Sequence, residues 1–339
     1  MVVRPDRIGD VVLSTPVYHT LKDSFPGSFV GALVSPMTSP LLKNNPYIDV
    51  ILTDKATPDN SNNGLWAKAR EIASYKFDTA LLLMPTGRLA YLLFLAGIPR
   101  RIGVGHILYE VITLMRGVSR HNYNPLRHES DYMLDLTRKI GAKNIWSTPE
   151  LFLAADEKHA AGEYLAGKGL SFERSIIGIH PGSGRSAPNW TVERYVDLAR
   201  KLSEAGNQVL ITGSESERHV ENSFLGIKAP GLRTSFGECS LRELAAVISH
   251  LTCLISGSTG PMHIAAALGV PTISMFCPLT ACSPKLWGPV GNSAVIVSPG
   301  EKFCATQCPG DPHICTFGSG DEGITIDTII TAQKQSQVV

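Results

Sequence analysis

The stretch CLISGSTGPMHIAAALGVPTISMF, residues 253–276, decides the fold class of this chain. It begins with a short, apolar and β-rich run over residues 253–256 and ends with a second one over residues 272–276. A helical pattern over residues 262–268 lies between them, and Pro261 suits its first turn because an N–H is not needed there. Strand, helix and strand in this order predict a βαβ unit with parallel strands.

The same alternation extends over most of the chain. It predicts further strands over residues 29–34, 50–53, 79–84, 101–104, 175–180 and 208–212. It predicts further helices over residues 11–24, 65–75, 88–96, 128–140, 192–204, 215–225, 241–249 and 326–335. Residues 300–323, with Cys, Pro and Gly, interrupt the pattern, and we expect them to form a surface loop. The chain is therefore predicted to be an α/β protein with helices on both faces of its parallel sheets.

A polar, Pro-containing segment near residues 141–155 separates two such series. The helical pattern before it ends at Gly141, and a new helix is expected to begin near Asp156. We predict two Rossmann-like domains, residues 1–150 and 151–339, with their sheets facing a central cleft. Because parallel sheets bind ligands at the carboxyl ends of their strands, that cleft is the expected site.

The composition restricts the class of protein. Of 339 residues, 43% are apolar and 18% are charged, which excludes disorder as the main state. The net charge of +1 argues against a general nucleic-acid binder, since such proteins carry a clear basic excess. Residues 1–150 hold 17 Lys and Arg against 13 Asp and Glu, which suits an anionic partner. Chance variation in the charges of the surface explains this small basic excess about as well as an anionic partner does.

Three features predict a cytoplasmic protein. The first residues turn polar at once, unlike a secretory signal peptide. The longest apolar stretch, residues 89–98, is well short of the roughly 20 residues that a membrane-spanning helix needs. Seven cysteines, an odd number, fit a reducing compartment better than a disulfide framework.

The first motif that bears chemistry is Arg7-Ile8-Gly9-Asp10, between the opening strand and the first helix. Gly9 permits a tight turn of the backbone, and Asp10 then stands at the start of a helix. There it either complements the helix dipole, which is the simpler interpretation, or acts as a general base toward an attacking hydroxyl.

A second motif is the Gly- and Ser-rich loop of residues 179–190, which leads from a strand to a helix near Thr191. Free N–H groups in such a loop and the positive end of the helix dipole favour a phosphate. Arg185 would add a bidentate contact to a diphosphate. The loop has neither the Walker pattern nor the dinucleotide fingerprint, and the chain therefore lacks the signature of an NAD enzyme.

The stretch quoted first contains a second loop of this kind, residues 256–260. Its amides at Thr259 and Gly260, with that of Met262, predict a second anion site. His263 is either structural or a hydrogen-bond donor near the phosphates. Two anion loops in one half and the Asp10 carboxylate in the other predict a transferase that uses a nucleotide sugar.

These motifs resemble glycosyltransferase family nine, the ADP-heptose:lipopolysaccharide heptosyltransferases, over residues 7–291. Residues 7–10 match the Arg-x-Gly-Asp that opens the family's sequences. The family's second motif is His-Pro-Gly-Ser, followed by a Trp and then by Glu-Arg in a helix. It is matched by residues 180–183, 190 and 193–194. Thr-Gly-Pro-Met-His followed by Ala-Ala-Leu-Gly-Val-Pro is matched without a gap over residues 259–271.

The resemblance implies a GT-B fold and the inverting transfer of heptose from ADP-heptose to the lipopolysaccharide inner core, without a metal or other cofactor. It implies Asp10 as the general base. The acceptor would be a lipid-linked anionic saccharide, reached at the cytoplasmic surface of the inner membrane by peripheral contact. The residues implied around the donor are Ser183, Arg185, Thr259, Gly260, Pro261, Met262 and His263, with Glu215 near the ribose.

Departures from the family pattern leave alternatives open. Pro188 stands where the family often has Lys or Arg, so Arg185 would take over that phosphate contact. Gly257 and Ser258 replace a common Asn-Asp pair, which leaves open another nucleotide sugar or acceptor, or a non-enzymatic binder of sugar nucleotides. The short opening strand suggests a truncated or misassigned start of the chain.

Two further groups have competing interpretations. Arg88, Arg100 and Arg101 either contact the anionic acceptor or are solvated surface residues. Three cysteines near the C-terminus, together with a histidine, lack the paired CxxC spacing of strong zinc sites. We therefore expect a structural or redox-inert loop without a metal at Cys304, Cys308, His313 and Cys315.

Overall fold

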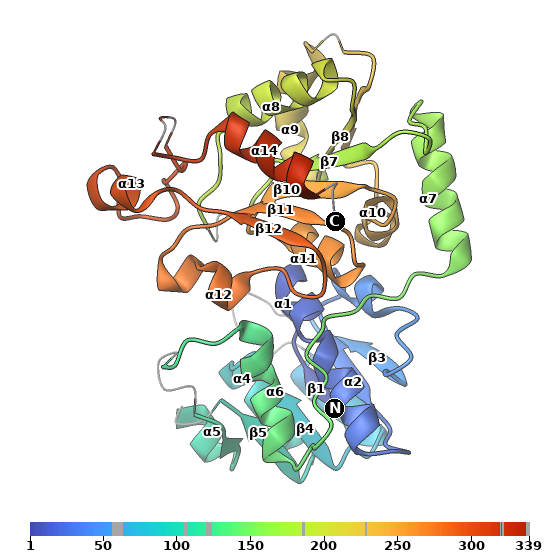
Figure 1. Ribbon diagram of the computed structural model, residues 1–339. Coiled ribbons are helices and arrows are strands. Elements are labelled where there is room, and N and C mark those ends of the chain that lie inside the picture. Colours follow the sequence, from blue (N-terminus) through green and yellow to red (C-terminus); the bar gives the residue numbers. More distant parts are fainter. Residues whose placement is uncertain are drawn as a thin grey trace. The chain divides into compact units, whose positions relative to one another are not determined.

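A computed structural model of the chain describes residues 1–55, 64–104, 108–119, 124–184, 187–227, 229–318, 320 and 322–336. The chain divides into two compact units, Met1–Leu151 and Phe152–Val339. Each unit is built around a six-stranded sheet, and helices flank the strands in both (Figure 1). All neighbouring strands run parallel, which confirms the predicted α/β class.

The first unit has the strand order β3-β2-β1-β4-β5-β6. Its strands are β1 (Val2–Val3), β2 (Gly31–Val34), β3 (Val50–Thr53), β4 (Thr79–Leu82), β5 (Arg100–Gly103) and β6 (Arg116–Gly117). Its helices are α1 (Ile8–Leu13), α2 (Thr15–Ser24), η1 (Ser39–Leu42), α3 (Leu65–Ser74), α4 (Gly87–Leu95), α5 (Leu108–Ile112) and α6 (Glu129–Lys139). Apolar side chains of α3 and α4 pack against the central strands and form one core.

The helix expected over residues 11–24 is two helices, because the chain breaks at Ser14. The hydroxyls of Ser14 and Thr15 donate to the carbonyls of Val11 and Val12, both at 2.7 Å. Such bonds compete with the helical backbone pattern. Pro16 lies in the first turn of α2, where it lacks the N–H that a continuous helix would use.

The second unit has the strand order β12-β11-β10-β7-β8-β9. Its strands are β7 (Ile176–His180), β8 (Gln208–Gly213), β9 (Leu232–Phe236), β10 (Cys253–Gly257), β11 (Thr272–Met275) and β12 (Ala294–Val297). Its helices are α7 (Ala155–Gly167), α8 (Val192–Glu204), η3 (Glu215–Glu217), α9 (Arg218–Leu225), α10 (Leu241–Ile248), α11 (Gly260–Ala267), η4 (Thr280–Cys282), α12 (Pro284–Trp287), α13 (Glu301–Thr306) and α14 (Ile326–Ser336).

The expectation of a mere surface loop over residues 300–323 is wrong. The segment contains α13, and the side chains of Phe303 and Phe317 are buried. Arg194 donates to the Thr316 carbonyl at 3.0 Å, which ties the segment to α8. Burial of two aromatic rings stabilises this packing, and a Cys, Pro and Gly composition does not reveal it.

Candidate active site

In the second unit, β7 lies between β10 and β8, and the order of the strands reverses between β7 and β10. Ser256 of β10 is the register partner of His180 in β7, and Ile179 is the partner of Ile211 in β8. The loops that follow these three parallel strands therefore leave the same edge of the sheet. Such a reversal point is where open α/β sheets bind ligands.

The loop after β7 begins at Pro181 and holds Ser183, which is half-buried. Arg185 lies outside the described residues, so its contact with a phosphate stays a prediction. A Cβ atom on Gly182 would lie 1.9 Å from a carboxylate oxygen of Glu217. A side chain at position 182 would therefore displace the Glu217 carboxylate, which lies against this loop.

The strand end before this loop carries an uncharged histidine. Burial lowers the pKa of His180, which keeps the imidazole neutral. Its Nδ1 lies 3.0 Å from the hydroxyl of Thr212 on β8. This contact orients the ring without a charge at the base of the loop.

The loop after β10 leads into α11, with Thr259 at the N-cap position. The Thr259 side chain makes no capping hydrogen bond, and its Oγ1 is buried without a partner among the described residues. A buried polar atom of this kind is costly unless a ligand or water satisfies it. The early amides of α11, at Gly260 and Met262, add hydrogen-bond donors and the positive end of the helix dipole.

Three side chains of the first turn of α11 are largely withdrawn from solvent. Pro261, Met262 and His263 are all buried. The backbone N–H groups at the start of α11 and the positive end of its dipole suit an anion. A specific side-chain role for these three residues stays a prediction.

The predicted ribose contact, Glu215, begins η3 after β8. Its side chain is exposed and pairs with Arg218 at 2.8 Å. The carboxylate beside the β7 loop is that of Glu217, which accepts from the Ser214 N–H at 2.8 Å. The sequence analysis missed Glu217, although Ser-x-x-Glu at 214–217 is the pattern of a capping box that fixes this side chain.

In the first unit, the strand order reverses between β1 and β4. Asp10 lies in the first turn of α1, shortly after β1. The buried guanidinium of Arg4 pairs with the Asp10 carboxylate and donates to the Leu83 carbonyl, just after β4, at 2.7 Å. Arg4 also lies 3.9 Å from Glu129 and 3.5 Å from Asp6. Asp10 is thus held at the reversal point of its own sheet by a residue that the sequence analysis missed.

Two opposing effects act on the ionisation of Asp10. Burial raises the pKa of its carboxyl above the ordinary value, and the charge of Arg4 acts in the opposite direction. The net shift is upward. Asp10 is therefore a stronger base than an exposed aspartate, while its pairing with Arg4 favours the ionised form.

The three arginines expected at the acceptor have partners within the first unit. Arg88 is buried and forms a salt bridge with the buried Asp54. Arg101 is buried and donates to the Thr113 carbonyl at 2.8 Å, and the half-buried Arg100 donates to the Lys139 carbonyl at 3.3 Å. Arg88 and Arg101 are therefore not solvated surface residues, whereas Arg100 is partly exposed. Contact of any of the three with an acceptor stays a prediction.

The cysteine-bearing segment offers free thiols. Cys304 and Cys308 are partly buried and Cys315 is buried. Burial raises the pKa of Cys304, which disfavours the thiolate that a metal would need. Within the described parts of the chain, no three His, Cys, Asp or Glu side chains come together so as to hold a metal ion.

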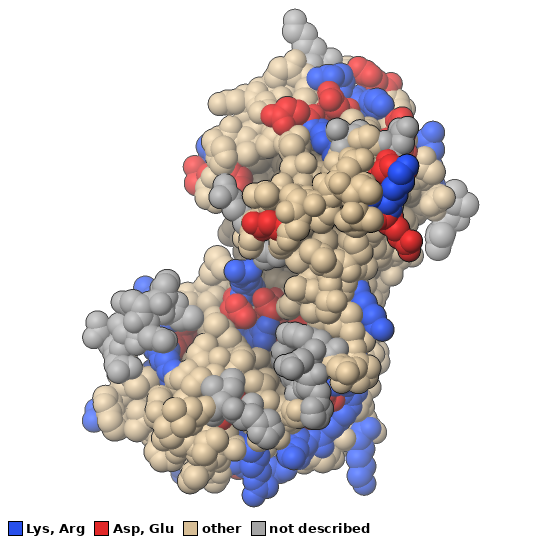
Figure 2. All heavy atoms as spheres, turned by 90° about the vertical axis from the view of Figure 1, so that its left-hand side faces the viewer, with Lys and Arg blue, Asp and Glu red and all other residues tan. Residues whose placement is uncertain are grey.

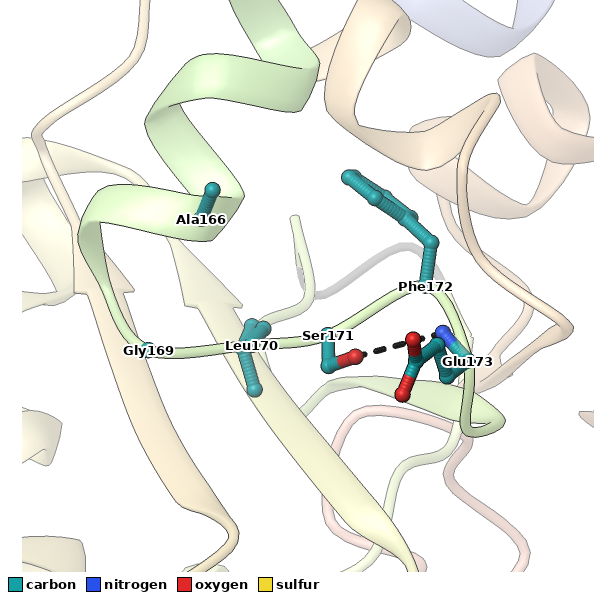
Figure 3. Close-up of a pocket in the computed structure, with 6 residues that line it drawn as sticks. All are labelled: Ala166, Gly169, Leu170, Ser171, Phe172 and Glu173. Atoms are coloured by element: carbon teal, nitrogen blue, oxygen red, sulfur yellow. Dashed lines mark hydrogen bonds between the residues drawn. The ribbon is translucent and has the colours of Figure 1, made fainter.

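A surface hollow of about 700 Å³ lies elsewhere on the second unit, beside the end of α7 (Figure 3). Within it, the Glu173 N–H donates to the Ser171 hydroxyl at 3.2 Å. Its lining belongs to none of the loops that follow β7, β8 and β10, so the hollow is separate from the candidate site. The residues that line it are Ala166, Gly169, Leu170, Ser171, Phe172 and Glu173.

Comparison with known proteins identifies a family and its fold. The model of glycosyltransferase family 9 (heptosyltransferase) matches residues 65–310. Lipopolysaccharide heptosyltransferase 2 of Escherichia coli (strain K12) is 26% identical over 317 residues, which cover 88% of this chain and 87% of that protein.

Solved structures share the fold over nearly the whole chain. A family 9 glycosyltransferase from Veillonella parvula superimposes with a TM-score of 0.85 at 23% identity, covering 99% of this chain and 96% of the other. ADP-heptose lipopolysaccharide heptosyltransferase II of E. coli gives a TM-score of 0.79 at 21% identity, covering 99% and 98%. The predicted GT-B fold is thereby confirmed.

Proposed function

Because the chain belongs to glycosyltransferase family 9, we propose that it transfers heptose from ADP-heptose to a saccharide of the lipopolysaccharide inner core. The relative that is 26% identical is named a lipopolysaccharide heptosyltransferase, and the name of a structural neighbour includes ADP-heptose. These names support both the donor and the acceptor class.

The observation that carries the donor site is the buried Thr259 Oγ1, which has no hydrogen-bond partner among the described residues. A diphosphate oxygen would accept from this hydroxyl and from the first amides of α11. In the proposal, Ser183 and Arg185 bind the same diphosphate from the neighbouring loop. Pro261, Met262 and His263 surround the nucleotide, and Glu215 binds the ribose.

Asp10 is proposed as the general base. Its carboxylate takes the proton of the acceptor hydroxyl while the hydroxyl oxygen forms a bond to the anomeric carbon of the donor. The bond from that carbon to the diphosphate breaks, ADP leaves with the electron pair, and the configuration inverts. Amides and cationic side chains stabilise the charge on ADP, and the proposed reaction uses no metal or cofactor.

The acceptor is proposed to be anionic and lipid-linked. In Figure 2, Lys and Arg side chains gather along the lower edge of the first unit. Among the helices that the structure describes, none is long and apolar enough to cross a membrane. We therefore propose a cytoplasmic enzyme that meets its acceptor by peripheral contact with the inner membrane, with Arg88, Arg100 and Arg101 near the saccharide.

A second candidate is transfer of another sugar from a nucleotide donor. Gly257 and Ser258 favour it, because they lack the amide and carboxylate groups that a family member commonly places before Thr-Gly-Pro. The fold, the base and the diphosphate site would be the same in this alternative.

Calorimetric titration of the full chain with ADP, UDP, GDP and CDP tests the donor. Selective ADP binding, followed by turnover of ADP-heptose with an inner-core acceptor, is the expected result. A preference for another nucleoside diphosphate would replace the heptose donor by the second candidate. Binding of ADP without turnover of any nucleotide sugar would remove the proposed transfer itself.

A further inference from the structure

A chain of polar contacts joins the two anion loops of the second unit. The Asn189 amide Nδ2 donates to the Pro181 carbonyl at 2.8 Å, at the start of the β7 loop. The Tyr195 hydroxyl donates to the Asn189 Oδ1 at 2.6 Å. Burial raises the pKa of the Tyr195 hydroxyl, and the neighbouring backbone of Gly257, the last residue of β10, acts in the opposite direction.

Asn189 occupies the space beside Gly257 that a side chain would need. A Cβ atom at position 257 would lie 2.8 Å from the Asn189 Oδ1. Carbon and oxygen atoms without a bond do not approach so closely, so any larger residue at 257 would displace the Asn189 amide. The Asn189 side chain can therefore keep its observed position only because residue 257 is a glycine.

Tyr195 holds these contacts in place because its own side chain is immobilised by packing. It is fully buried on α8, and its ring packs edge-on against Trp190 with 5.6 Å between the ring centres. Buried polar groups that are fully hydrogen-bonded hold one conformation, because leaving any of them unpaired is costly. The two loops are thus connected through a rigid side chain as well as through the neighbouring strands.

We propose that Asn189 and Tyr195 are positioning residues that set the spacing of the two diphosphate-binding loops. The inference rests on the proposed function and adds two residues to it. Neither residue needs to touch the nucleotide, because each acts through the loop backbone. Their loss would misplace the amides that bind the donor diphosphate in both the substrate and the product.

Tyr195→Phe is the sharpest test, because it removes a single oxygen and keeps the buried ring. We expect ADP affinity to fall roughly 3- to 10-fold, the range of one net hydrogen bond. The donor KM should rise by a similar factor and kcat should change less. Tyr164→Phe is the matched control, since its hydroxyl also bonds two side chains of the second unit, Ser235 at 2.7 Å and Glu238 at 2.8 Å.

A merely structural role would lower the melting temperature in both variants and leave ADP affinity unchanged well below melting. Unchanged affinity and donor KM in Tyr195→Phe would overturn the inference while the proposed function stands. No binding of any nucleoside diphosphate by the wild-type protein would instead overturn the proposed donor, and the inference with it.

Gly257→Ala provides an independent test through a double-mutant cycle. In the wild-type background the added methyl meets the Asn189 oxygen and should weaken ADP binding. In an Asn189→Ala background that oxygen is gone, so the same change should have a much smaller effect. Equal effects in the two backgrounds would show that Asn189 does not connect to position 257.

Discussion

Arg4, which is buried, and Asp10, which is partly buried, form an ion pair at the reversal point of the first sheet, and the same guanidinium also donates to the Leu83 carbonyl just after β4. The carboxylate is thereby tied to two neighbouring strands of the sheet and cannot turn freely. Such a fixed orientation favours a general base, because the carboxylate is already placed to accept the substrate proton before the substrate binds. The charge of Arg4 also lowers the pKa of Asp10, so the ionisation of the carboxyl depends on this residue.

Asp10→Asn should reduce kcat by about 10²- to 10⁴-fold, the usual contribution of a positioned base. ADP affinity should stay near that of the wild type, because the donor loops belong to the other unit. Asp6→Asn is a suitable control, since Asp6 also lies within 3.5 Å of Arg4 but is more exposed. Steady-state kinetics and calorimetry on the three proteins measure both quantities, and full turnover by Asp10→Asn would remove it from the mechanism.

The pH dependence of kcat/KM should report Asp10. The base acts as the carboxylate, so activity falls as pH decreases through its pKa. Burial raises this pKa, so the acidic limb should lie above the ordinary aspartate value of about 3.9. Arg4→Met removes the charge that lowers the pKa and should move the limb to higher pH. An acidic limb that is the same in both proteins would assign it to another group.

Thr259→Val should weaken ADP binding by about 10- to 100-fold, because a hydrogen bond to a charged group is lost. The fold should not lose stability, since the hydroxyl has no hydrogen-bond partner among the described residues of the unliganded protein. Ser274→Ala is the control: its Oγ is also buried without a described partner but lies within β11. Equal ADP affinity in Thr259→Val and wild type would place the diphosphate elsewhere.

Arg88→Ala should destabilise the protein by about 3–5 kcal/mol, because it leaves the Asp54 carboxylate buried without its cation. Replacing both partners, in Arg88→Met with Asp54→Leu, should restore most of this loss. Urea unfolding followed by circular dichroism measures the two changes. A stable Arg88→Ala protein with a raised acceptor KM would favour the acceptor contact over the structural one.

Local patterns predicted much of the architecture. The strand over residues 50–53 and the helix over residues 192–204 have the predicted bounds. The missed strands β6, β9 and β12 are all edge strands. The edge strand β3 was nevertheless predicted, so a position at the edge does not by itself weaken the pattern. β6 has only two residues and β9 contains Arg, Thr and Ser, so neither forms a continuous apolar run. The candidate donor loops were found because Gly, Ser and Pro before a helix are a local signal.

The sequence by itself determined the α/β class, the two series of βαβ units and the residue types of the anion loops. These follow from hydrophobic periodicity and turn chemistry, which act between residues close together in the chain. Only the tertiary structure decided which distant residues meet: Arg4 with the Leu83 carbonyl, and Asn189 with Gly257. Such pairs depend on the order and register of the strands. That order is set by the packing of distant segments, for which no local pattern exists.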